Sequence, residues 1–257
     1  MMNITTLTFD TLDSTNTQAL KHARLGAAEG LCIIARQQTA GRGRYGRTWA
    51  SAIDSGLYFS IVLRPKLEPS FLPIITLMSG VAVHDTLVEL GAHPDIKWVN
   101  DVLIEEKKVS GILAETTETL IGLAVIVGIG INITSDNFPL EIAETATSLQ
   151  EATGAAVPPA ELAETLTKYL SYFYSLLNGN DGAAIILDEW RKRSSFYAGK
   201  TVKVAMENEV IRGVTDGLES NGALRVKTVD GRVSIIQAGD VQRLRADEGE
   251  RQARLSL

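Results

Sequence analysis

The sequence predicts an α+β fold in two parts, a large mixed domain followed by a small β-barrel. Three apolar, β-prone runs follow one another between residues 96 and 133 with short polar connections, which is typical of an antiparallel meander. Segments with helical spacing flank these runs on both sides. After about residue 195, short β-prone pieces are separated by glycines, as expected for a small barrel. The chain of 257 residues is long enough to bury a substantial core.

The first half of the chain alternates β-prone runs with helical segments. Residues 13–16 are Asp-Ser-Thr-Asn, four residue types favoured at helix N-caps, and the helix that they start is expected to stop near Gly26. A later segment rich in glycine and arginine has neither a helical nor a strand period and predicts a loop. The elements expected here are strands over 4–9, 31–36 and 57–63 and helices over 14–26 and 73–90.

The second half holds the meander, three further helices and the predicted barrel. The proline pair at 158–159 is expected to introduce the longest of these helices, and the last one ends on three cations, which the helix dipole favours there. The meander strands are expected over 96–104, 109–115 and 120–133. A short helix is expected to start at 147–149, and longer ones are expected over 159–177 and 183–193. The barrel strands are expected over 201–204, 210–214, 224–228, 234–236 and 241–244. The predicted domains are 1–195 and 196–246, followed by a polar tail over 247–257.

Composition excludes several classes of protein. With 45% hydrophobic and 22% charged residues, the chain is typical of a folded protein and not of a disordered one. The longest apolar run, 120–131, is shorter than the roughly 20 residues that cross a bilayer, and the amino terminus lacks a secretory signal. Together with a lone cysteine, Cys32, this predicts a cytoplasmic protein without a membrane partner. The three histidines lack zinc-site spacing, so no metal site is predicted.

Charge is distributed unevenly along the chain. The net charge is 25 minus 31, or −6, which gives the whole protein no electrostatic reason to bind nucleic acid. Between Arg36 and Lys66, however, five arginines and one lysine accompany a single acid, Asp54, for a local charge of +5. This segment suggests an anionic ligand.

The glycine-rich part of the basic segment matches a nucleotide-binding fingerprint only superficially. Residues 41–46 satisfy Gly-x-Gly-x-x-Gly, but a strand pattern follows where a dinucleotide-binding fold needs a helix. The arginines Arg42, Arg44 and Arg47 instead suggest a mobile loop whose guanidinium groups close over phosphate or carboxylate. On charge and glycine content alone, a flexible basic turn without a ligand is an equally good interpretation.

Charged residues also occur in the first predicted meander strand. Alternation along a strand places Lys97, Val99 and Asp101 on one face and Trp98 and Asn100 on the other. One face of the sheet can therefore carry an ammonium group and a carboxylate together. An ordinary solvated strand face remains the alternative interpretation of such a pair.

Taken together, six motifs occur in the order seen in biotin protein ligases, and the chain resembles that family from about residue 8 to residue 244. In one-letter code they are DSTN at 13–16, QTAGRGRYGRTW at 38–49, KWVND at 97–101, KVSGILAE at 108–115, GIGIN at 128–132 and TSL at 147–149. The resemblance implies a catalytic domain related to class II aminoacyl-tRNA synthetases and a carboxyl-terminal SH3-like barrel. Val99 stands where many members have proline. Only 12 residues precede Asp13, so we expect the monofunctional type without a DNA-binding domain.

The resemblance also implies a two-step reaction. Biotin and ATP give biotinyl-5′-AMP and pyrophosphate, with Mg²⁺ bridging phosphate oxygens, and the biotinyl group then passes to one lysine of a biotin carboxyl carrier protein domain. The family places Lys97 between the biotin carboxylate and the α-phosphate, and Arg42 and Arg44 over the activated acyl group, which makes these three the expected catalytic residues. Asp101 is expected to orient or deprotonate the carrier lysine, or to play a structural hydrogen-bonding role.

The remaining site residues implied by the resemblance fall into two groups. Either Ser14 or Thr15 can cap the helix while the other binds. The biotin-binding positions are Ser14, Thr15, Gln38, Arg42, Arg44, Lys97, Gly111, Gly128 and Gly130. The nucleotide-binding positions are Arg42, Arg44, Arg47, Trp49, Asn100, Lys108 and Asn132.

Two other functions remain open at this stage. Lipoate or octanoyl ligases share the catalytic fold but lack the arginine motif, and a non-catalytic biotin sensor would release no pyrophosphate. Because biotinyl-AMP hydrolyses in water, the arginine loop, residues 41–49, is expected to be loose in the free protein and ordered over a ligand. We expect a monomer or a homodimer.

Overall fold

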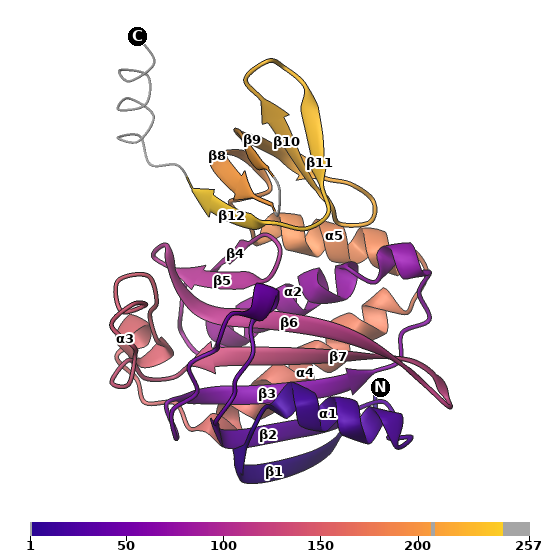
Figure 1. Cartoon of the computed structure of the whole chain (residues 1–257), viewed down its shortest axis with the longest axis vertical. Helices are drawn as coiled ribbons and strands as arrows, with labels where there is room; N and C mark the ends of the chain where they lie inside the picture. Colours follow the sequence, from indigo (N-terminus) through magenta and orange to yellow (C-terminus); the bar gives the residue numbers. More distant parts are fainter. Residues whose placement is uncertain (1, 207–208, 244–257) are drawn as a thin grey trace.

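A computed structural model describes residues 2–206 and 209–243 and contains two β-sheets (Figure 1). The larger sheet has seven strands in the order β1-β2-β3-β7-β6-β5-β4, and the smaller one has five in the order β11-β10-β9-β8-β12. Only the β1–β2 pair is parallel among these strands, and every other neighbouring pair is antiparallel. This is the α+β architecture that the sequence predicts.

The elements agree closely with the predicted order. The helices are α1 (Thr15–Arg24), α2 (Ile74–Glu89), α3 (Leu149–Thr153), α4 (Pro159–Leu177) and α5 (Gly182–Lys192). The strands of the larger sheet are β1 (Thr5–Leu12), β2 (Leu31–Gln38), β3 (Gly56–Leu63), β4 (Asp95–Lys97), β5 (Asp101–Ile104), β6 (Lys107–Thr119) and β7 (Gly122–Asn132). Those of the smaller sheet are β8 (Ala198–Ala205), β9 (Val210–Leu218), β10 (Leu224–Thr228), β11 (Val233–Ile236) and β12 (Asp240–Arg243).

The two faces of the larger sheet differ in what covers them. Alternate residues of β3, such as Phe59 and Ile61, face a core that includes α2 and α4. On the opposite face, Val62 packs with Ile33 and Ile126 beneath α1. Because α1 is short, it covers only part of this second face. The uncovered part, beyond the amino end of α1, is where the candidate site lies.

The apolar spacing indicated a helix buried on one face, but α2 is buried on most sides. The helical stretch Pro69–Glu89 is long and apolar enough to cross a membrane by length and composition, but 61% of that apolar window is buried within the fold. The helix packs against α4, α5 and the sheet. Its composition is therefore that of a central core helix.

The prediction of a single strand over 96–104 is wrong, because this segment forms two strands, β4 and β5. The chain turns at residues 98–100, so that β4 and β5 form a hairpin in which Lys97 pairs with Asp101 across the two strands. Asn100 stabilises the turn, because its side chain donates to the carbonyl of Ile112 and its own carbonyl accepts from the Ile112 amide. Lys97 and Asp101 thus meet by cross-strand pairing and not by alternation along one strand.

The carboxyl-terminal sheet curls into a half-barrel beside the larger sheet (Figure 1). The two parts are in contact: the buried indole of Trp98 donates a hydrogen bond to the carbonyl of Gly222, 2.9 Å away. The tail predicted over 247–257 and the end of the strand predicted over 241–244 lie outside the described residues. The boundary between 195 and 196 remains a prediction, between the end of α5 and the start of β8.

Candidate active site

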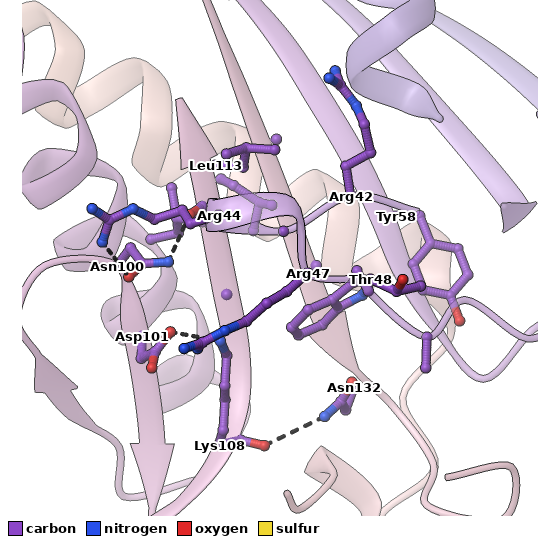
Figure 2. Close-up of a pocket in the computed structure, with 18 of the residues that line it drawn as sticks. Arg42, Arg44, Arg47, Thr48, Tyr58, Asn100, Asp101, Lys108, Leu113 and Asn132 are labelled. Atoms are coloured by element: carbon purple, nitrogen blue, oxygen red, sulfur yellow. Dashed lines mark hydrogen bonds and ion pairs between the residues drawn. The ribbon is translucent and has the colours of Figure 1, made fainter. Parts of the chain in front are cut away.

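A cavity of about 250 Å³ opens on the larger sheet at the amino end of α1 (Figure 2). Its walls come from the start of α1, the arginine loop, β5 and the facing strands β6 and β7. Segments that are distant in sequence therefore meet here because sheet register brings them together. Of the predicted site residues, all except Lys97 line the cavity: Ser14, Thr15, Gln38, Arg42, Arg44, Arg47, Trp49, Asn100, Asp101, Lys108, Gly111, Gly128, Gly130 and Asn132.

Glycines in β6 and β7 leave room on the cavity floor. A Cβ atom at Gly130 would lie 2.3 Å from the ring of Trp49, and one at Gly128 would lie 2.2 Å from the side-chain oxygen of Asn16. At Gly111 the nearest atom, again of the Trp49 ring, would be 2.9 Å away. Real Cβ atoms do not approach other atoms so closely, so these positions require glycine for close packing.

Polar groups converge at the end of the cavity next to α1. The Thr15 amide donates to Oε1 of Gln38 at 2.8 Å, and Nε2 of Gln38 donates to the Ser51 hydroxyl at 2.8 Å. Ser14 occupies the N-cap of α1 but its hydroxyl makes no capping hydrogen bond. Both Ser14 and Thr15 are buried. This end therefore offers hydroxyl and amide groups suited to a small ligand with both donors and acceptors.

The lysine that lies in the cavity is Lys108 and not Lys97. Lys108 Nζ is 2.6 Å from Oδ1 of Asp101 and lies over the Trp49 ring, 5.4 Å from its centroid. Lys97 Nζ is 2.9 Å from the other oxygen of Asp101 and does not line the cavity. The β4–β5 hairpin, which strand alternation did not predict, pairs Lys97 with Asp101 across two strands. Of the two lysines paired with Asp101, Lys108 is the one that lines the cavity in this conformation.

Asp101 is an ionised carboxylate held between two lysines. Burial by itself would raise its pKa, but the charges of Lys108 and Lys97 and their hydrogen bonds outweigh burial, so the pKa of Asp101 lies below its ordinary value. Both oxygens accept from an ammonium group. Asp101 thus fixes the position of Lys108, and a carboxylate with a lowered pKa is a weak base at neutral pH.

Replacing Asp101 with asparagine is expected to lower the free energy of unfolding by about 3 kcal/mol at pH 7, because two lysines lose their buried partner. A lowered folded-state pKa gives stability that is present above the unfolded pKa and lost as pH falls through the folded value. The difference from wild type should therefore shrink below about pH 4. Urea unfolding across pH measures this. The exposed Asp136→Asn is the control, and a difference that stays constant down to pH 3 would contradict the assignment.

The three arginines of the arginine loop point in different directions (Figure 2). Arg44 donates to Oδ1 of Asn100 at 3.2 Å, and Arg47 contacts Asp240 of the carboxyl-terminal sheet at 2.9 Å. Arg42 points away from the other two and pairs with Glu115 of β6. A bridge between Arg42 and Thr48 closes the base of the loop. In this conformation the loop lies over the cavity, with Arg44 and Arg47 at its edge.

Asn132 is tied to the backbone and does not point freely into the cavity. Its Nδ2 donates to the carbonyl of Thr147 at 3.0 Å and to that of Lys108 at 3.4 Å. Figure 2 shows the contact with Lys108. Sequence reasoning also missed Asp240, which is 193 residues from its partner Arg47. No local motif could have indicated that contact. Glu115 lies at the end of a recognised motif, but without the register of β6 nothing assigned it a partner.

Known proteins resemble this chain over nearly its whole length. Residues 8–132 match the biotin/lipoate A/B protein ligase family, and residues 197–244 match the biotin protein ligase C-terminal domain. The chain is 33% identical to the biotin–[acetyl-CoA-carboxylase] ligase of Paracoccus denitrificans, over 89% of this chain and 96% of that protein. It is 32% identical to the bifunctional ligase/repressor BirA of Bacillus spizizenii, over 91% of this chain and 72% of that protein.

The fold is also similar to a solved structure with ligands. The biotin protein ligase from Aquifex aeolicus, in complex with biotin and ATP, superposes with a TM-score of 0.81 at 31% identity. The match covers 93% of this chain and 99% of that chain. Both parts of the molecule therefore have counterparts in proteins of one kind.

Proposed function

Because this chain belongs to the biotin protein ligase family, we propose that it activates biotin with ATP and transfers the biotinyl group to a carrier lysine. The first step forms the mixed anhydride biotinyl-5′-AMP and releases pyrophosphate. In the second step the carrier amine attacks the acyl carbon and AMP leaves. The observation that carries the proposal is one cavity holding the hydroxyl and amide groups of Ser14, Thr15 and Gln38 together with the ammonium of Lys108.

The cavity matches the parts of biotin. A ureido ring has two N–H donors and one carbonyl acceptor, which the buried hydroxyls and the Gln38 amide complement. The apolar ring and chain of biotin would pack beside Trp49, whose ring lies directly against the glycine floor at Gly130 and lines the cavity. The carboxylate then lies toward Lys108. This assigns one end of the cavity to recognition and the other to chemistry.

Activation requires two anionic groups to meet, the biotin carboxylate and the α-phosphate. Two unit charges 4 Å apart repel by about 1 kcal/mol in water and by several-fold more at a lower effective dielectric. Lys108 is placed to stabilise both, and its ion pair with Asp101 fixes it in advance. We therefore assign the central role to Lys108 in place of Lys97, and to Asp101 the orientation of Lys108 in preference to deprotonation of the carrier lysine.

The phosphates of ATP are expected beside the arginine loop, within reach of Arg44 and Arg47. The carboxylates that line the cavity, Asp101 and Asp240, are both paired with cations. A Mg²⁺ ion arriving with ATP would therefore be held chiefly by phosphate oxygens, where it would neutralise charge on the leaving pyrophosphate. Asn100 and Asn132 complete the wall on the nucleotide side.

The proposed partner is a biotin carboxyl carrier protein domain of a biotin-dependent carboxylase. The relative from Paracoccus denitrificans is named biotin–[acetyl-CoA-carboxylase] ligase, after a carboxylase of this kind. A reducing, cytoplasmic setting suits the single buried cysteine, Cys32. The net charge of −6 favours a role without DNA. We expect the protein to be a monomer or a homodimer.

Mass spectrometry of a carrier domain tests the function directly. The protein is incubated with MgATP and biotin or lipoate, with and without the carrier. We expect the carrier to gain one biotinyl group only when enzyme, biotin and MgATP are all present, and pyrophosphate to appear even without the carrier. A carrier lipoylated in preference to biotinylated would favour a lipoate ligase instead. Biotin binding without pyrophosphate release would indicate a sensor.

Gly130→Ala is expected to weaken biotin binding by about 10- to 100-fold, because the added methyl group overlaps the Trp49 ring and overpacking costs about 1–3 kcal/mol. Isothermal titration calorimetry with biotin measures the change. Gly80→Ala in α2 is the matched control, since its Cβ would meet its nearest neighbour at an ordinary 3.4 Å. Equal biotin affinity in Gly130→Ala and wild type would contradict the proposed binding of biotin beside Gly130 and Trp49.

A further inference from the structure

Arg42 lines the cavity, but its guanidinium pairs with Glu115, which does not, whereas Arg44 and Arg47 contact residues of the cavity wall. Its two terminal nitrogens lie 3.0 and 2.7 Å from the two oxygens of Glu115, a bidentate ion pair with β6 (Figure 2 shows the direction of Arg42). Such paired geometry is directional and stronger than a single contact between the same charges. The guanidinium is therefore already occupied, and it lies on the side of the loop that faces away from Arg44.

Glu115 continues into a buried chain of hydrogen bonds. Asn16, on the first turn of α1, donates from Nδ2 to Glu115 at 2.8 Å and to the Leu113 carbonyl at 3.2 Å. The Ser60 hydroxyl lies 2.6 Å from Oδ1 of Asn16 and 2.7 Å from the hydroxyl of Thr15. Asn16, Ser60 and Thr15 are each at most 4% exposed. The chain thus runs from Arg42 on the loop to Thr15 at the recognition end of the cavity.

The chemistry of these groups fixes the direction of the hydrogen bonds of Asn16 and limits that of Thr15. Nδ2 of Asn16 faces two acceptors, so Oδ1 faces Ser60 and can only accept. The single proton of the Ser60 hydroxyl must therefore go to Asn16. The Thr15 hydroxyl then donates its own proton either to the Ser60 hydroxyl at 2.7 Å or to Oε1 of Gln38 at 3.2 Å, and in both cases a lone pair of Thr15 stays open to a further donor. Thr15 is consequently set as an acceptor, the role needed opposite a ureido N–H.

We propose that Glu115 and Asn16 are positioning residues for biotin activation. They hold the base of the arginine loop through Arg42 and set the Thr15 hydroxyl as an acceptor for a biotin N–H. In this proposal Arg42 acts through Glu115 and does not touch the phosphates, which differs from the catalytic role that the resemblance implies. This inference rests on the proposed function. Gly128 supports the same chain of hydrogen bonds, because a Cβ at this position would displace the side-chain amide of Asn16.

A double-mutant cycle separates the two possible roles of Arg42. Arg42→Ala, Glu115→Gln and the double variant are compared for the KM of biotin, the KM of ATP and kcat in pyrophosphate release. Because both residues act through the same ion pair, we expect each single variant to raise the KM of biotin about 10-fold or more. The double variant should have a KM of biotin no higher than that of the more impaired single variant. The KM of ATP should change less than about 2-fold. Glu118→Gln, an exposed acid on the same strand, is the control.

A second pair of variants tests the hydrogen bond between Asn16 and Glu115. Asn16→Asp places two carboxylates together and should raise the biotin KM, whereas combining Asn16→Asp with Glu115→Gln restores a donor and an acceptor and should recover part of the loss. Thermal unfolding of every variant identifies those that fail to fold. Rescue without change in melting temperature supports positioning over a purely structural role.

The results that overturn the inference are distinct from those that overturn the function. Arg42→Ala is measured both in the wild-type background and in the Glu115→Gln background. If it lowers kcat and raises the KM of ATP by the same factor in both, Arg42 contacts the nucleotide and the inference fails. Absence of rescue in the doubly exchanged variant, with the fold intact, also counts against it. If the wild-type protein releases no pyrophosphate from biotin and MgATP, the proposed function itself fails.

Discussion

Lys108→Ala is expected to slow the formation of biotinyl-AMP by about 100- to 1000-fold, the cost typical of removing one group that stabilises charge in a transition state. Lys108 is the lysine that lines the cavity, and its partner Asp101 holds it there. Single-turnover release of pyrophosphate measures the effect on chemistry alone. Asp101 keeps Lys97 as a partner in this variant, so the fold should survive.

Two other lysines serve as comparisons for Lys108. Lys107→Ala removes the adjacent ammonium, which does not line the cavity, and should leave the rate unchanged. Lys97→Ala should reduce the rate far less than Lys108→Ala, because Lys97 pairs with the other oxygen of Asp101 and does not line the cavity. The reverse order of the two effects, with Lys97 the more important, would restore the assignment drawn from the sequence and contradict the one drawn from the structure.

Arg44→Ala is expected to release biotinyl-AMP from the protein at least about 10-fold faster while leaving the fold intact. Arg44 is held at the cavity edge by Asn100 and by the carbonyl of Gly239, so its loss removes a contact between the arginine loop and both parts of the molecule. A contact worth about 1.4 kcal/mol in the bound state corresponds to this factor. Released biotinyl-AMP acylates exposed lysines of a bystander protein, and the extent of that labelling measures the release.

The control for Arg44 is Arg36→Ala, which removes an arginine of the same basic segment outside the cavity. Arg36 is paired with Asp10 and Asp54 at the surface, and its loss should cause no labelling of bystanders. Equal retention of biotinyl-AMP by Arg44→Ala and wild type, with equal synthesis, would show that the loop does not hold the intermediate.

Local sequence patterns predict most of the fold. Cap residues and apolar periodicity together predict the five α-helices of the described residues, and the glycine-separated pieces after residue 195 become the strands of the second sheet. The exception is the turn at 98–100, which is fixed by hydrogen bonds between Asn100 and Ile112 on a neighbouring strand. Such a pairing is invisible to a period of two along one strand. The hairpin also separates the two lysines that flank Asp101, because Lys108 lines the cavity and Lys97 does not.

The same reasoning explains what could be predicted of the site. The glycines and the Ser-Thr pair belong to contiguous motifs, so the resemblance places them without knowledge of the fold. The partners of Arg42 and Arg47 are Glu115 and Asp240, which are 73 and 193 residues away. Their contacts depend on the register of β6 and on the docking of the second sheet. Only the structure brings these charges together.

The central claim is that one cavity holds biotin by its ureido ring while Lys108 draws its carboxylate to the α-phosphate. A crystal structure of the protein with biotinyl-AMP measures this most directly. We expect the Lys108 ammonium within hydrogen-bonding distance of both the acyl and the phosphate oxygens, the ureido ring on Thr15 and Gln38, and Lys97 still paired with Asp101. Biotinyl-AMP bound elsewhere, or in this cavity with Lys108 turned away and Lys97 on the phosphate, would contradict the account.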